Sequence, residues 1–270
     1  RWGTVAAVGE PKSKSPLKDK PLRRPGQSLL EERRRLIDDK LEPWSMMALF
    51  FLVLTLFEWG RYWRPIPPMP WLMTVVAVGI AGFAVLRYVK YWPQLKALRL
   101  AIEGERVVGD YLERMRSKGY RVFHDVMTDG FNIDHVLIGP GGVFTIETKT
   151  WSKPARGDAR VTYDGNQVLV AGQTPDRDPI AQAASQARWI GRVLLESTGR
   201  KLPVQPVVVF PGWYVDAAPG SQHTVWVMEP KGLPAFLSKQ AARLSAEDVR
   251  LAVFHLSRFI RSGERERADK

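Results

Sequence analysis

The chain has no cysteine among its 270 residues, which excludes disulfide bonds and cysteine-ligated zinc sites. Histidine is scarce as well, and the four histidines show no metal-ligand spacing such as two histidines separated by three residues. A third absence is local, because residues 73–86 contain no charged side chain. The first two absences argue against a metal centre built from cysteine or histidine, and the third identifies a strongly apolar segment.

Positive charge is in excess, with a formal net charge of +12 at pH 7, but it is unevenly placed. Residues 1–42 carry +4, residues 43–100 carry +5, and residues 101–270 carry only +3. Most of the excess therefore flanks a hydrophobic region. This distribution is better evidence for membrane topology than for nucleic-acid binding.

Two long apolar runs cover residues 43–57, extending through Glu58 toward Trp63, and residues 66–86. A membrane-spanning helix needs about 20 mostly apolar residues, which the first run reaches only if Glu58 lies at the headgroup level. Aromatic residues gather at the ends of both runs, as in an interfacial belt: Trp44, Trp59, Tyr62, Trp63, Trp71, Tyr88, Tyr91 and Trp92. The alternative is a buried helical hairpin in a soluble protein, and the uncharged run with aromatic ends favours a membrane hairpin.

Basic residues flank this region on both sides, whereas the connecting loop has only Arg61 and Arg64. The positive-inside rule then predicts that both ends of the hairpin face the cytoplasm. We expect an integral membrane protein, of a bacterial inner membrane, with both termini and the globular part cytoplasmic. The lipid bilayer is one expected partner, since the cationic flanks could also touch anionic lipid.

The composition predicts four regions along the chain. Residues 1–42 form a basic, largely disordered leader, in which residues 28–42 could make a charged amphipathic helix. Residues 43–98 form a two-helix transmembrane hairpin, residues 99–262 a globular domain, and residues 263–270 a charged tail.

Helix and strand patterns alternate through the globular part. Gly119 ends a first helix, Asp164-Gly165 turns a hairpin, and Asp178 caps a helix that has Pro179 at its first position. The predicted helices cover residues 102–117, 178–197 and 246–261, and the predicted strands 120–126, two strands within 129–151, 160–170, 204–210 and 224–228. This order predicts an α/β fold with a mixed sheet flanked by helices.

Residues 129–151 carry the most informative pattern, because charged residues interrupt two short apolar strands joined by a Gly/Pro turn. Residues i and i+2 of a strand share a face, so Glu147 and Lys149 should project side by side. Burying such charges costs several kcal/mol unless they are paired or coordinate something. Asp134, Glu147 and Lys149 together form the pattern that a phosphodiesterase needs, with two carboxylates for a hard cation and an ammonium beside them.

Glu-x-Lys is a short pattern that occurs three times, at Glu10, Glu147 and Glu229. The last copy even has an aspartate, Asp216, at the offset that separates Asp134 from Glu147, but that aspartate lies in a predicted turn. Pro230 also argues against a central strand there. Only the Glu147 copy continues an apolar strand without a break, so we place the chemistry there rather than assign it to a solvated ion pair.

Other residues could complete a site. Glu105 lies on the apolar side of its predicted helix, as a third acid for the cation or as a first-turn glutamate favoured by the helix dipole. Gln182 and Gln186, one turn apart, could reach a phosphate or Lys149, or simply be solvated. Four residues near the motif could contact nucleic acid through charge and stacking, or be ordinary loop residues: Trp151, Lys153, Arg156 and Arg160.

With these residues in place, the segment from Gly104 to Pro211 resembles the NERD domain, the nuclease-related domain of the PD-(D/E)xK phosphodiesterase superfamily. The resemblance rests on three features in order: Gly104-Glu105, the strands carrying Asp134, Glu147 and Lys149, and Asp178-Pro179-Ile180-Ala181-Gln182. Two departures are Ile133 in place of the superfamily's proline and Asp178 where asparagine is more frequent. Neither change removes a candidate ligand.

The resemblance implies a restriction-endonuclease-like core and metal-dependent cleavage of nucleic acid, with DNA favoured over RNA. Asp134 and Glu147 would ligate Mg²⁺ or Mn²⁺, with Glu105 assisting. Lys149 would orient the attacking water and Gln182 would orient Lys149 or the substrate. A catalytically silent, membrane-tethered module that binds nucleic acid or protein is the competing class, and a membrane scaffold with structural ion pairs is a third. The oligomeric state is not indicated by the sequence.

Overall fold

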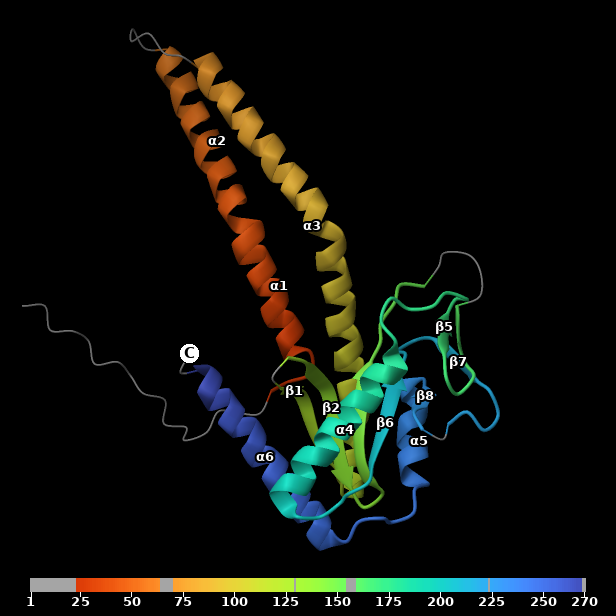
Figure 1. Cartoon of the computed structure of the whole chain (residues 1–270). Coiled ribbons are helices and arrows are strands. Elements are labelled where there is room, and N and C mark those ends of the chain that lie inside the picture. The colour runs from red at the N-terminus through yellow and green to blue at the C-terminus, as the bar shows by residue number, and fades with distance from the viewer. Residues whose placement is uncertain (1–22, 64–69, 129, 154–158, 223, 269–270) are drawn as a thin grey trace, which may run out of the picture.

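The computed structural model describes residues 23–63, 70–128, 130–153, 159–222 and 224–268. It consists of a long helical arm that rises from an α/β body (Figure 1). Most of the predicted leader, residues 1–22, lies outside the described residues. The predicted tail at 263–270 is largely the end of a helix rather than a separate element.

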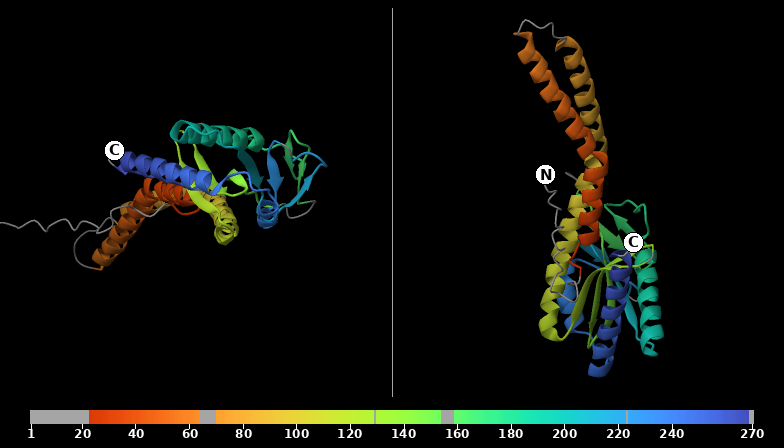
Figure 2. Two further views of the ribbon diagram at one scale, coloured as in Figure 1. Left: turned by 90° about the horizontal axis from the view of Figure 1, so that it is seen from below. Right: turned by 90° about the vertical axis from the view of Figure 1, so that its left-hand side faces the viewer.

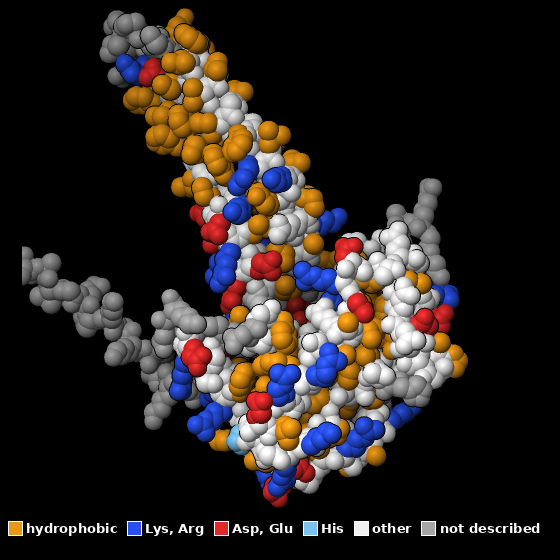
Figure 3. Space-filling model, in the orientation of Figure 1, with side chains coloured by type: hydrophobic (Ala, Val, Ile, Leu, Met, Phe, Trp, Pro, Cys, Tyr) orange, Lys and Arg blue, Asp and Glu red, His pale blue; other side chains and the backbone are white. Residues whose placement is uncertain are grey.

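The arm contains α1 (Gln27–Lys40), α2 (Glu42–Tyr62) and the first part of α3 (Pro70–Glu113). The stretches 27–62 and 70–118 are each long and apolar enough to cross a membrane, by length and composition alone. Only 11% and 6% of their most apolar windows are buried, so neither stretch is a core helix within the described structure. Their apolar side chains cover the upper arm in Figure 3.

Helix α3 runs without a break from the apolar arm into the body, with Pro93 inside it. The predicted boundary at residue 98 therefore lies within one continuous helix. The helix predicted at 102–117 is the last part of α3 followed by a 3₁₀ turn at Arg114–Lys118, and Gly119, with φ 83°, ends it as expected.

The main sheet has the strand order β1-β2-β3-β6-β8. Its members are β1 (Arg121–Met127), β2 (Asn132–Gly139), β3 (Gly142–Thr148), β6 (Val204–Val209) and β8 (Trp226–Met228). The first three strands are antiparallel, whereas β3, β6 and β8 are parallel. The prediction of an α/β fold with a mixed sheet, preceded by two long apolar helices, is confirmed.

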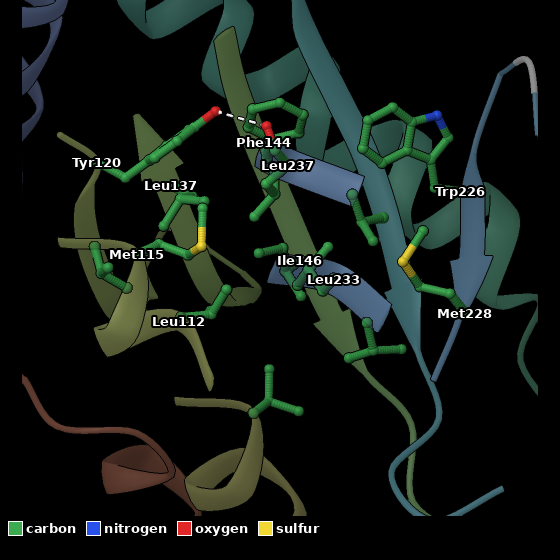
Figure 4. Close-up of a cluster of buried hydrophobic side chains, with 14 residues drawn as sticks. Leu112, Met115, Tyr120, Leu137, Phe144, Ile146, Trp226, Met228, Leu233 and Leu237 are labelled. Carbon is green, nitrogen blue, oxygen red and sulfur yellow. Dashed lines mark hydrogen bonds between the residues drawn. The ribbon is translucent and has the colours of Figure 1, made fainter. Parts of the chain in front are cut away.

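Helices cover both faces of this sheet (Figure 2). On one face, α3 and α5 (Leu233–Ser238) enclose an apolar cluster that includes Leu112, Phe144 and Ile146 (Figure 4). On the other face lie α4 (Pro179–Thr198) and α6 (Ala246–Ala268). Helix α4 begins as predicted, since Asp178 accepts a hydrogen bond from the Ile180 amide at 2.8 Å.

A second, smaller sheet has the order β5-β4-β7. The hairpin of β4 (Arg160–Tyr163) and β5 (Val168–Val170) was expected, but β7 (Tyr214–Ala217) was not. The prediction of a turn at Asp216 is wrong, because this residue pairs with Thr162 in a parallel ladder. Contacts with a strand more than 50 residues earlier override the local turn signal. The short helix α5 was also missed.

Candidate functional site

Two acids face each other at one end of the main sheet. The register pairs His135 of β2 with Ile146 of β3, so Asp134 lies opposite Glu147 one step further along. Directly opposed like charges on neighbouring strands are destabilising. Glu147 is only 4% exposed, while Asp134 keeps partial exposure. A fold that holds two carboxylates in this way needs compensating donors or a cation.

Glu147 receives three side-chain donors. Lys149 Nζ lies 2.8 Å from its Oε1 atom, which confirms that the two side chains project together. Gln182 Nε2 donates to the same oxygen at 2.7 Å, and Gln186 Nε2 donates to Oε2 at 2.5 Å. Both glutamines come from the first turns of α4, where they are one turn apart.

Gln182 also fixes the lysine. Its Oε1 atom accepts a hydrogen bond from Lys149 Nζ at 2.7 Å, while its Nε2 atom serves Glu147. Both ends of this amide are thus engaged, which sets its orientation. Gln186, 1% exposed, holds Glu147 and also donates to the Asn132 carbonyl at 3.2 Å. The solvated-glutamine interpretation is therefore wrong for both residues.

Asp134 accepts a hydrogen bond from the Thr148 amide at 2.7 Å. Burial among protein atoms raises its pKa well above the usual value, and the neighbouring charges of Glu147 and Glu105 raise it further. The Thr148 amide and Lys149 act in the opposite direction but do not cancel these effects. The surroundings thus favour the protonated acid unless positive charge arrives.

Glu105 approaches from the other layer, on α3. It is 6% exposed, and burial, with the charges of Asp125 and Glu147, raises its pKa to about 8. The first-turn interpretation is wrong, because Glu105 lies deep inside a 44-residue helix. The backbone of Gly104 beside it packs so closely that a Cβ atom there would lie 2.1 Å from Thr150 Cγ2. This contact places Glu105 next to the end of β3.

The acids fit a divalent cation in charge and chemistry, since they supply carboxylate oxygens. Burial and neighbouring negative charge raise the pKa values of Glu105 and Asp134, and a bound cation would offset this charge. Among the described residues, however, no three acids or histidines are gathered closely enough to form a ready metal cluster. Glu105 comes from a different layer than Asp134 and Glu147, and both Glu147 oxygens already accept hydrogen bonds. Asp134 and Glu147 are the better-placed pair.

The other Glu-x-Lys copies differ in surroundings. Glu229 and Lys231 form an ion pair of 3.2 Å, but their side chains are 32% and 68% exposed. They lie at a 3₁₀ turn, Pro230–Gly232, after β8 ends. Glu10 is outside the described residues. The pair that continues a strand, Glu147 and Lys149, is therefore largely buried, and the pair after β8 is exposed, as the sequence predicted.

Three of the four residues proposed to contact nucleic acid are described, and their surroundings differ. Trp151 stacks on Phe210 with ring centroids 5.7 Å apart, so one face of its indole is used inside the protein. Arg160 pairs with Asp216 at 3.0 Å on the small sheet. Lys153 is exposed, and Arg156 lies outside the described residues.

A larger concentration of positive charge, missed from the sequence, lines a groove of about 1140 Å³ between α6 and the start of β1. Its five arginines include four on one face of α6, spaced by three, four or eight residues: Arg121, Arg250, Arg258, Arg261 and Arg265. Glu266 also lines the groove. The helical spacing of these arginines was a signal available in the sequence.

Asp125 is a further acid that the sequence analysis did not select. It is 1% exposed, has a φ of 50°, and is bound by Arg23 and by the Ser28 amide. Its strand position gave no signal of this role. His135 is buried as expected, with its Nδ1 atom 2.9 Å from His124 Nδ1.

Part of the chain is similar to known proteins. No curated protein matches the chain. A solved structure of SfsA from Pyrococcus furiosus in complex with Ca²⁺ is similar at 14% sequence identity and a TM-score of 0.25, covering 45% of this chain and 55% of SfsA. Residues 100–211, which contain Glu105, Asp134, Glu147, Lys149 and Gln182, match the family described as the nuclease-related domain (NERD).

Proposed function

We propose that this protein is a membrane-anchored, metal-dependent nuclease that hydrolyses phosphodiester bonds of nucleic acid, with DNA the favoured substrate. The observation that carries the proposal is the network in which Gln182 bridges Glu147 and Lys149 opposite Asp134. A structural ion pair needs only Glu147 and Lys149. The opposed second acid and the shared glutamine are what a phosphoryl-transfer site would use in addition.

Lys149 is suited to act on a phosphate. Its ammonium has three hydrogens, two of which are directed to Gln182 and Glu147. The third can be donated to a phosphate oxygen, where it would stabilise the negative charge that develops during attack by water. Because the side chain is 18% exposed, substrate can reach the ammonium without opening the core.

In this proposal Asp134 and Glu147 hold Mg²⁺ or Mn²⁺, and Glu105 contributes charge from the facing layer. When bound, the cation would make a water molecule more acidic and stabilise charge on the phosphate. Other residues of the chain hold the two carboxylates in position. Gln182 and Gln186 hold the Glu147 carboxylate, and the Thr148 amide holds Asp134.

The apolar arm supports the membrane part of the proposal. Large side chains such as Phe50, Phe57 and Trp63 are 59%, 66% and 82% exposed, which is costly in water over so long a surface. Burial of this surface in a bilayer removes that cost. The basic flanks at both ends of the hairpin favour a cytoplasmic position for the nuclease-related domain.

The test is cleavage by the full chain purified in detergent. Linear, supercoiled and single-stranded DNA, and RNA, are incubated with Mg²⁺, Mn²⁺ or EDTA. Lys149→Ala is expected to abolish cleavage, with a stability loss of only about 1–3 kcal/mol because Glu147 keeps both amide donors. Lys231→Ala is the matched control, since it removes the lysine of an exposed Glu-x-Lys pair.

Each result has a definite meaning. Metal-dependent cutting that is lost only in Lys149→Ala supports the nuclease and identifies its substrate. Cutting that survives in Lys149→Ala shows that the site is assigned wrongly. Metal-dependent binding without cutting favours the catalytically silent binding module. Neither binding nor cutting favours a scaffold in which these acids form structural contacts.

A further inference from the structure

The segment that precedes the apolar arm is built into the nuclease-related body. Arg23 is 11% exposed at its side chain, and its Nε atom lies 2.5 Å from Asp125 Oδ2. The same arginine reaches Glu31 at 3.0 Å. The Ser28 amide donates to Asp125 Oδ2 at 2.8 Å. The two contacts with Asp125 join residues about 100 positions apart, across the whole hairpin.

Packing supports the same attachment. Pro25 lies against the backbone of α3, since a Cβ atom at Gly109 would be only 2.5 Å from Pro25 Cγ. Gly26 has a φ of 70° and begins α1, and its backbone lies beside Ile102. The chain therefore crosses α3 within one turn of Glu105. We name Arg23–Ser28 the N-terminal clasp.

The clasp contacts acids of the candidate site. The Gly26 backbone forms a hydrogen bond with the Glu105 carboxylate, and Ser28 and Arg23 bind Asp125. The amide groups at the beginning of α1 thus meet two buried carboxylates that also interact with each other. Asp125 holds a left-handed backbone conformation, which is costly for aspartate and persists only where surrounding contacts enforce it.

We infer that the N-terminal clasp is a positioning element of the acidic site, which fixes Glu105 through Asp125 and Gly26 and thereby couples the site to the membrane arm. The role in catalysis rests on the proposed function, whereas the coupling does not. Helix α1 continues directly from the clasp toward α2, and it lies alongside α3 (Figure 1). Any displacement of α1 along α3 would pull on Arg23, Gly26 and Ser28 together.

The first measurement is hydrogen exchange of the full chain in detergent without metal. Arg23→Ala is expected to increase exchange at least tenfold in residues 100–109 and 121–127. Arg24→Ala is the matched control, because Arg24 is exposed and its hydrogen bonds with Gln27 use its backbone amide and carbonyl, which the substitution keeps. Equal exchange in the two variants would overturn the coupling.

The second measurement separates positioning from stability. The Mn²⁺ concentration that gives half-maximal cleavage should rise about tenfold in Arg23→Ala, and Arg23→Lys should restore part of the loss. Mn²⁺ binding followed by electron paramagnetic resonance should change in parallel. If this Mn²⁺ concentration is unchanged in Arg23→Ala, the clasp is only a structural contact and the positioning role is wrong. If wild-type protein does not cleave, the proposed function fails, and Mn²⁺ binding with hydrogen exchange still decides the clasp.

A third variant covers the case in which Arg23→Ala does not fold. The chain has no native cysteine, so Pro25→Cys with Gly109→Cys gives a single disulfide across the clasp. In the oxidised form, exchange in residues 100–109 should fall below the wild-type value, and reduction should restore it. Failure of the two cysteines to pair, or no effect of pairing on exchange, would contradict the contact.

Discussion

The pKa of Glu105 makes a prediction about stability and pH. In the folded chain this carboxyl has a pKa of about 8, whereas its ordinary value is 4.5. Between these values the folded chain keeps a proton that the unfolded chain releases. The free energy of unfolding therefore falls as the pH rises through this window. Asp134 contributes in the same direction, since its pKa is also raised.

The effect of Glu105 on stability is easiest to measure in the pH range where the histidines do not change their protonation. His124 and His135 have lowered pKa values, so they make stability rise with pH below about 6.5 and contribute nothing above it. From pH 6.5 to 8, the contribution of Glu105 should lower the free energy of unfolding by about 1.5 kcal/mol, and the contribution of Asp134 adds to it. Glu105→Gln removes this contribution and keeps an oxygen that can accept the Gly26 hydrogen bond.

The assay is hydrogen exchange of β2 and β3 in the metal-free full chain, corrected for the intrinsic pH dependence of exchange. Glu105→Gln should flatten the pH dependence and exceed the wild type in stability at pH 8. Glu103→Gln is the control, because Glu103 lies two residues away on the same helix, with a side chain that is 57% exposed and paired with Arg99. The same slope in wild type and Glu105→Gln, or a stability that rises with pH in wild type, would refute the reasoning.

Two further predictions follow from packing and charge. Gly104→Ala should destabilise the body by about 1–3 kcal/mol, measured by thermal unfolding, because the new Cβ would lie 2.1 Å from Thr150 Cγ2. Arg258→Glu with Arg261→Glu should weaken DNA binding on the order of tenfold at moderate salt, measured by fluorescence anisotropy, if the groove beside α6 holds phosphates.

Each of these two predictions has a control: another glycine in α3 for the packing prediction, and another pair of helical arginines for the charge prediction. Gly82→Ala, also in α3, places a Cβ in open space and should not lower stability, because alanine favours the helix more than glycine does. Equal losses in the two alanine variants would mean that the contact with Thr150 does not decide the result. Arg188→Glu with Arg192→Glu changes the charge of exposed arginines on α4 by the same amount. Equal weakening there would show that only net charge matters.

Much of the body could be predicted because its signals are local. Alternating apolar residues, the Asp178 cap with Pro179, and the turn at Gly119 each specify an element within a few residues. Glu147 and Lys149 could be placed together because strand geometry alone puts residues i and i+2 on one face. The confirmed ion pair between them at 2.8 Å needed no tertiary information.

What the sequence did not reveal depends on contacts between distant segments. Strand β7 exists because it pairs with β4, and the turn-forming residues around Asp216 concealed it. Asp125 acquires its role only when Arg23 and Ser28 arrive from before the hairpin. The alternative that placed Glu105 in the first turn of a helix was wrong because α3 begins 32 residues before the predicted start at residue 102.

The continuity of α3 has a consequence for where substrate can be cut. A helix rises about 1.5 Å per residue, so Glu105 lies no more than about 27 Å along α3 from Arg87, which marks the end of the apolar run. In the proposed membrane orientation, one helix thus sets the height of the acids above the lipid surface. Nucleic acid would be cut only within this thin layer beside the bilayer, and molecules held farther away would be spared.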